Sequence, residues 1–106
     1  MKLSSDESQC QLHHERGQRV IEVCGELDLA TRGRLVDECR AGGCNDVVLD
    51  LAATTFLDCG GFGGIIAARQ VLEERGGSLV IRSAQGQPAR LLTLLGSNVP
   101  WGRPNI

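Results

Sequence analysis

Residues 46–66 read DVVLDLAATTFLDCGGFGGII, and this stretch decides the fold class. It begins with a short, nearly continuous apolar run at Asp46–Leu51, which is typical of a β-strand covered on both faces. A helical pattern follows the glycines and ends near residues 76–77; its apolar members are Phe62, Ile65, Ile66 and Leu72. The stretch therefore predicts a buried strand, a loop between residues 51 and 61, and a helix.

Similar patterns flank this unit. Weak alternation at residues 8–14, a turn at 16–18 and a β-branched run at 19–24 predict a β-hairpin. We expect residues 25–28 to break the second strand and Asp28 or Thr31 to cap a helix. The apolar face of that helix is Leu35, Val36 and Cys39, and Gly42 and Gly43 end it. Downstream, residues 78–82 repeat the buried strand, and Pro88 opens a last helix that Gly96 closes.

This order of elements predicts an α/β fold. A hairpin followed by helix, strand, helix, strand and helix places the helices against a mostly parallel sheet, with right-handed crossovers. The 106 residues suit one domain, residues 1–106. Pro100 and Pro104 limit any last strand to a short or edge position. Trp101 either plugs one end of the core or lies exposed as an interface anchor.

The composition disfavours two classes of partner. The chain has 11 basic and 13 acidic residues, a net charge of −2, and no tyrosine, so we expect no nucleic-acid partner. Its apolar runs are far shorter than the roughly 20 residues that cross a bilayer, and its first residues are too acidic for a signal peptide. We therefore expect no membrane partner and a cytoplasmic location.

The cysteines number five: Cys10, Cys24, Cys39, Cys44 and Cys59. An odd number, without a Cys-x-x-Cys pair, disfavours a full disulfide framework. We expect Cys24 and Cys39 in the core and regard Cys10 and Cys44 as the better candidates for a disulfide. Cys10 lies close to His13 and His14, but adjacent histidines on a strand point to opposite faces, so no metal site is expected.

The loop between residues 51 and 61 is the expected functional region. It follows a parallel strand, and partners meet α/β sheets beyond such carboxyl ends. Asp58-Cys59-Gly60-Gly61 leads into a helix start, where free amides favour an anion. We expect the glycines to let a docking partner approach closely; they are Gly60, Gly61, Gly63 and Gly64. No phosphate-binding loop motif is present, and no cofactor is predicted.

The sequence resembles the STAS domain, and within it the bacterial anti-sigma factor antagonists. The segments that carry the resemblance are Gly25–Asp28 (GELD), Val47–Leu51 (VVLDL) and Phe56–Gly63 (FLDCGGFG), and the likeness runs from about residue 20 to 95. It implies a non-enzymatic protein that binds an anti-sigma factor of the serine-kinase type and frees a sigma factor. In the family, phosphorylation by that kinase expels the antagonist, and a phosphatase restores it.

The implied partner-binding residues include one departure from the family pattern. They are Asp28, Asp58, Cys59, Gly60, Gly61 and Phe62, with Leu29 as a further apolar anchor. The family motif is Asp-Ser-Ser/Thr-Gly, with the phosphate two residues after the aspartate. That position is Gly60, which has no hydroxyl. The departure implies either that the protein binds its partner constitutively or that another residue carries the regulation. Asp28 has a second interpretation as a helix cap only.

Cys59 is the alternative place for regulation. A thiol near a helix start has a larger thiolate fraction, so oxidation of Cys59, alone or with Cys10 or Cys44, would replace the phosphate switch. Asp58 opposes this by disfavouring a second negative charge. The simpler interpretation is that Cys59 fills a tight loop.

Two other functional classes remain open. A thiol-dependent enzyme would use Cys59 as its nucleophile and would need His13 or His14 as a base, although both lie on the first strand. A passive scaffold in a stress-signalling complex would need no switch.

Overall fold

A computed structural model describes the backbone of residues 9–15, 18–42, 45–95 and 101–102, and the side chains of residues 18–42 and 45–95. The strands are β1 (Gln9–Glu15), β2 (Gln18–Leu27), β3 (Asp46–Asp50), β4 (Thr54–Leu57), β5 (Ser78–Arg82) and β6 (Trp101–Gly102). The helices are α1 (Arg32–Ala41), α2 (Cys59–Glu73) and α3 (Gly86–Leu94).

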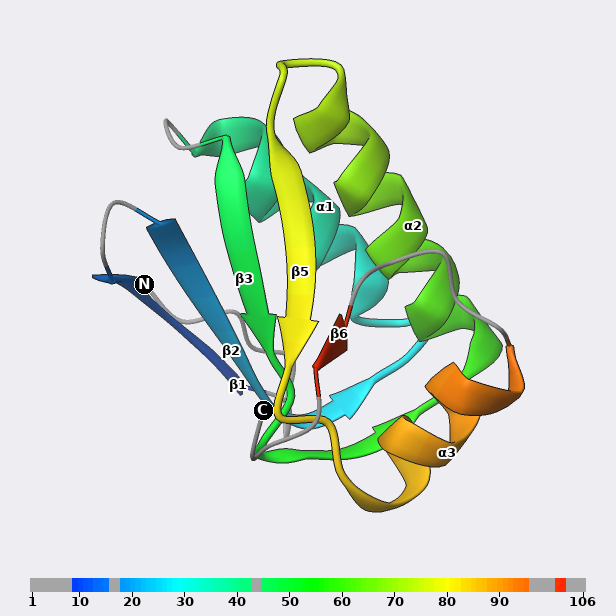
Figure 1. Ribbon diagram of the computed structural model, residues 1–106. Coiled ribbons are helices and arrows are strands. Elements are labelled where there is room, and N and C mark those ends of the chain that lie inside the picture. Colours follow the sequence, from blue (N-terminus) through cyan, green and yellow to red (C-terminus); the bar gives the residue numbers. More distant parts are fainter. Residues whose placement is uncertain (1–8, 16–17, 43–44, 96–100, 103–106) are drawn as a thin grey trace.

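The strands form one sheet of order β1-β2-β3-β5-β6. β1 and β2 are antiparallel, whereas the pairs β2–β3, β3–β5 and β5–β6 are parallel. Helices α1 and α2 lie side by side behind this sheet, and α3 lies below it against β4 (Figure 1). The predicted α/β class, the hairpin and the short final strand at an edge are confirmed. The side chain of Trp101, and Gly43 and Gly96, lie outside the described residues.

The core lies between the sheet and the two helices. Alternate residues of β2, β3 and β5 face the helices and are buried there: Ile21, Val23, Val47, Leu49, Leu79 and Ile81. Leu35 and Cys39 of α1 and Ile65 and Leu72 of α2 pack onto them. Val20 and Val48 are buried on the second face, so β3 is covered on both faces, as its apolar run predicted.

β2 is longer than predicted, because it changes partner partway along. Its first half pairs with β3, and a register shift at Gly25/Glu26 turns its second half towards β4. Gly25 adopts φ +91°, a conformation that favours glycine, and its amide donates to the Ala53 carbonyl at 3.0 Å. The prediction that residues 25–28 break the strand is therefore wrong: the glycine bends the strand but does not end it.

The predicted loop between residues 51 and 61 contains the unexpected strand β4. Only Thr54 and Leu57 of its four residues are buried, so the sequence shows no clear alternation. The buried Thr54 hydroxyl donates to the Val23 carbonyl at 2.8 Å, which secures β4 beside β2. β4 carries the chain to the start of α2, next to the end of β2.

The carboxyl end of α1 is held by two arginines, one in β2 and one in the turn after α2. Arg19 of β2 donates to the Glu38 carbonyl at 2.6 Å and forms an ion pair with the Glu38 carboxylate. Arg75, after α2, donates to the carbonyls of Cys39 and Arg40 at 3.0 and 2.6 Å. These bonds satisfy carbonyls that a helix end leaves without intrahelical partners, and they fix α1 relative to both the sheet and α2.

Candidate functional site

The start of α2 is capped by Asp58. Its carboxylate Oδ1 accepts a hydrogen bond from the Gly61 amide at 2.7 Å, and the helix begins at Cys59. An N-cap carboxylate both satisfies a free amide and complements the positive end of the helix. The chain therefore supplies its own anion at the helix start, where the sequence suggested a site for an external one.

Asp28 organises the neighbouring loop between β2 and α1. Its carboxylate accepts from the amides of Ala30 and Thr31 at 3.0 and 3.1 Å, and its own amide donates to the Thr31 hydroxyl at 2.9 Å. Thr31 occupies the N-cap position of α1 without a side-chain capping bond. Asp28 thus closes the turn before the helix, which fixes the position of Leu29.

The two loops touch through glycines. A Cβ atom on Gly60 would lie 2.9 Å from the Leu29 Cβ, and one on Gly61 would lie 2.1 Å from the Leu27 carbonyl oxygen. A Cβ on Gly64 would lie 2.5 Å from the Arg32 Cβ. Gly61 and Gly64 are both buried, and in the direction that an added Cβ atom would take, the space beside them is filled by the chain itself.

The surface at this junction is formed by the described residues Leu29, Asp58, Cys59 and Gly60, which we call the α2-start surface. Leu29 is 63% exposed, although it is a large apolar residue. Cys59 is exposed, whereas Asp58 and Gly60 are half-buried. Phe62 packs partly into the core, so Leu29 is the more accessible of the two predicted anchors. The structure thus brings the predicted loops together but leaves Gly61 inside.

Gln87 supports this surface from α3 and was not singled out from the sequence. Its side-chain Oε1 accepts from the Leu57 amide at 2.8 Å, and its Nε2 donates to the Leu57 carbonyl at 2.7 Å. The pair of bonds holds the end of β4 one residue before Asp58. The contact joins residues 30 apart in sequence, and no local pattern signals it.

The three described cysteines are free thiols in different surroundings. Cys59 is exposed, Cys24 is half-buried and Cys39 is buried. Burial raises the pKa of the Cys39 thiol to about 11, and the nearby Glu38 carboxylate adds to this against the opposing charges of Arg19 and Arg75. Cys39 is confirmed as a core residue, whereas the prediction of a core position is wrong for Cys24. The side chains of Cys10 and Cys44, the disulfide candidates, lie outside the described residues.

The raised pKa of Cys39 predicts a loss of stability at alkaline pH. The pKa is about 11 in the folded chain and 9.0 for an unperturbed thiol, so above pH 9 the unfolded chain binds fewer protons and the free energy of unfolding falls. The loss should reach on the order of 2–3 kcal/mol near the folded pKa. Urea unfolding of the wild type and Cys39→Ala across this range checks it, since the variant lacks this contribution. A constant stability difference between the two would contradict the prediction.

The enzyme hypothesis meets a geometric difficulty. His13 and His14 pair with Val20 and Arg19 at the beginning of β2, whereas the start of α2 packs near Leu27 at its end. Leu27 is seven residue steps along β2 from Val20, about 23 Å in an extended strand. A base on this part of β1 is therefore far from Cys59. Among the residues with described side chains, no group of three metal-ligating side chains occurs.

Comparisons with known proteins agree with this architecture. The sequence matches the family described as Mlab, STAS domain, over residues 10–99. The anti-sigma F factor antagonist of Paenibacillus polymyxa is 27% identical over 92 residues, which cover 83% of this chain and 79% of that protein. The chain therefore belongs to the STAS domain family, as its motifs predicted.

Solved structures confirm the fold. The crystal structure of an anti-sigma factor antagonist from Mycobacterium paratuberculosis has a TM-score of 0.78 at 23% identity, covering 97% of this chain and 91% of that one. The phosphorylated form of the Bacillus cell fate determinant SpoIIAA has a TM-score of 0.67 at 19% identity, covering 91% of each chain. In the part of this chain that the structure describes, no helix has the length and apolar character to cross a membrane.

Proposed function

We propose that this protein is an anti-sigma factor antagonist, which binds an anti-sigma factor of the serine-kinase type and thereby frees a sigma factor. The name of the Paenibacillus polymyxa relative and the family membership support this function. The protein would act as a binding module in the cytoplasm, where sigma factors work, and without a catalytic step of its own.

The observation that carries the proposal is the exposure of Leu29 at the α2-start surface. Leu29 is 63% exposed, and its loop is fixed by the Asp28 carboxylate and by contact with Gly60. A loop whose backbone is already ordered loses little conformational entropy on binding, which favours affinity. We assign Leu29 as the apolar anchor, with Asp58 and Cys59 beside it.

Gly60 supports binding that phosphorylation does not control. The residue that corresponds to the family phosphosite has no hydroxyl, and a Cβ added there would lie 2.9–3.1 Å from Leu29 atoms. Position 60 thus has neither a group to phosphorylate nor room for a side chain in this arrangement. Phosphorylation at position 60 therefore does not control the binding that we propose.

Leu29→Glu is expected to weaken binding of an anti-sigma factor of the serine-kinase type by about tenfold or more, because it places a charge at the centre of an apolar contact. Leu94→Glu is the matched control, since Leu94 is 81% exposed on α3. Isothermal titration calorimetry in reducing buffer measures both. Equal affinities of wild type and Leu29→Glu would contradict the role of Leu29, and absence of wild-type binding would contradict the function itself.

Oxidation of the exposed Cys59 is the form of regulation that we propose in place of phosphorylation. A peroxide would oxidise the Cys59 thiol to a sulfenic acid and be reduced to water, which enlarges the side chain beside Leu29 and adds polarity to the same surface. We expect Cys59 to react with a thiol reagent in the folded protein much faster than buried Cys39. Labelling of Cys59 no faster than that of Cys39 would contradict this regulation.

A further inference from the structure

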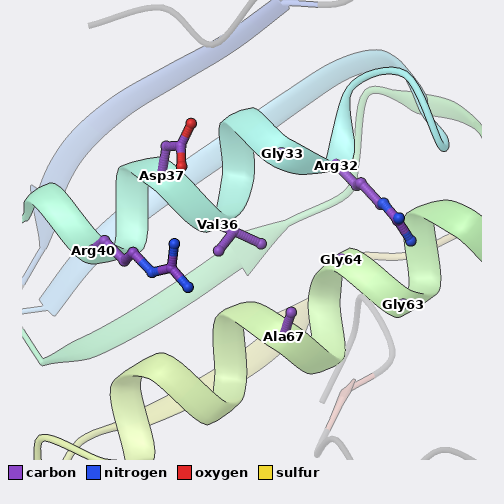
Figure 2. Close-up of a pocket in the computed structure, with 8 residues that line it drawn as sticks. All are labelled: Arg32, Gly33, Val36, Asp37, Arg40, Gly63, Gly64 and Ala67. Carbon is purple, nitrogen blue, oxygen red and sulfur yellow. The ribbon is translucent and has the colours of Figure 1, made fainter.

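An open groove runs between the outer surfaces of α1 and α2 (Figure 2). It has a volume of about 390 Å³. Gly63, Gly64 and Ala67 of α2 form its floor, and Arg32, Val36 and Arg40 of α1 form one wall. We call this feature the α1/α2 groove.

Helices α1 and α2 approach each other closely at Gly64, at the base of the groove. Gly64 is buried, and a Cβ atom there would lie 2.5 Å from the Arg32 Cβ. A Cβ on Gly63 would meet only the end of the Arg32 guanidinium, at 3.6 Å. The groove therefore offers backbone and small side chains at its base, which a ridge of side chains from a third helix would fit.

The charge of the groove is positive. Arg32 and Arg40 are exposed and eight residues apart, about 12 Å along α1. Both side chains extend towards α2 in Figure 2, whereas the Asp37 carboxylate points away from it. Within residues 18–42 and 45–95, neither guanidinium forms a hydrogen bond or an ion pair. Two guanidiniums without a charge partner among the described side chains thus lie at the two ends of one groove, and such groups are suited to bidentate binding of carboxylates.

We propose that the α1/α2 groove binds an acidic helical segment of the anti-sigma factor. Carboxylates about two helical turns apart on that segment pair with Arg32 and Arg40, and a small apolar side chain between them packs on Val36 and Ala67. None of the described residues that line the groove is aromatic and could stack on a nucleotide base, so a protein segment fits the groove better than a nucleotide does.

The groove is continuous with the α2-start surface. Arg32 is three residues after Leu29, and Gly63 is three residues after Gly60. A single partner can therefore cover both, with Leu29 supplying the apolar anchor and the groove selecting for acidic sequence. This inference rests on the proposed function and adds the chemistry that distinguishes one anti-sigma factor from another.

The test compares affinities for the anti-sigma factor by titration calorimetry at low and high salt. The double variant Arg32→Glu/Arg40→Glu should bind about tenfold more weakly or worse, because repulsion replaces attraction. Asp37→Asn should bind more tightly, since it removes the negative charge that borders the groove. Arg90→Glu, at an exposed arginine on α3, is a control for charge reversal away from the groove and should stay within about twofold.

The outcomes separate the two proposals. Weaker binding of the double variant, tighter binding of Asp37→Asn and a smaller salt dependence in the double variant would support the groove. Wild-type binding that neither the double variant nor Asp37→Asn alters would overturn it and leave the proposed function intact. Absence of wild-type binding would overturn both. Misfolding of the double variant cannot imitate the result, because Asp37→Asn must change affinity in the opposite direction.

Discussion

Replacing Glu38 by alanine is expected to lower the free energy of unfolding by about 3–5 kcal/mol, because it leaves a buried charge without its partner. Arg19 is 4% exposed and Glu38 is 7% exposed, and the two form an ion pair inside the fold. Arg19 also donates to the Glu38 carbonyl at 2.6 Å, but that single bond cannot replace the lost carboxylate. Urea unfolding at neutral pH measures the change.

Two further variants show whether burial is the cause. Glu73→Ala removes the exposed Arg69–Glu73 pair, whose N–O distance is 3.1 Å, and should change stability by at most about 0.5 kcal/mol. The double variant Arg19→Met/Glu38→Leu should recover most of the stability, because apolar side chains of similar length replace both charges. A loss below about 1 kcal/mol for Glu38→Ala would contradict the account of this pair.

Gly61→Ala is expected to destabilise the fold by about 3 kcal/mol and to disturb the α2-start surface. The new Cβ would lie 2.1 Å from the Leu27 carbonyl oxygen, and that oxygen belongs to backbone that cannot rotate away. The start of α2 must then move from the end of β2, which breaks the contact between the two loops. Thermal and urea unfolding measure the loss of stability.

Gly33→Ala is the matched control for Gly61→Ala. Gly33 is in α1, is exposed, and has no atom within 4 Å of an added Cβ. Alanine there should stabilise the protein by up to about 1 kcal/mol, since it favours the helix and restricts the unfolded chain. Equal effects of the two substitutions would contradict the close approach at Gly61.

Local sequence patterns predicted most of the fold. The buried strand at Asp46–Asp50 has a continuous apolar run, and the buried face of α2 has an apolar stripe through Ile65 and Leu72. Both patterns are visible in the sequence. The hairpin, the alternation of helices with parallel strands and a helix after the Asp58–Gly61 loop followed from such patterns and from connection rules. The resemblance to the STAS domain was carried by the same segments and is confirmed.

The details of the site could not be predicted in the same way, because they depend on contacts between distant segments. β4 pairs with β2 beyond a bend at Gly25, and its four residues carry too weak a pattern to indicate a strand. The sequence identified the glycines after Asp58 as important, but only the structure shows that Gly61 and Gly64 accommodate Leu27 and Arg32. The Gln87 side chain forms a hydrogen bond with the backbone of Leu57, which is 30 residues away in the sequence.

The most direct test of the central proposal is release of the sigma factor from its complex with the anti-sigma factor. The purified protein should displace the sigma factor to the same extent with ATP as without it, and mass spectrometry should find no phosphoryl group on residues 58–61. Failure to displace the sigma factor under either condition would contradict the proposed function. Displacement that ATP abolishes, together with phosphorylation of the protein, would contradict constitutive binding.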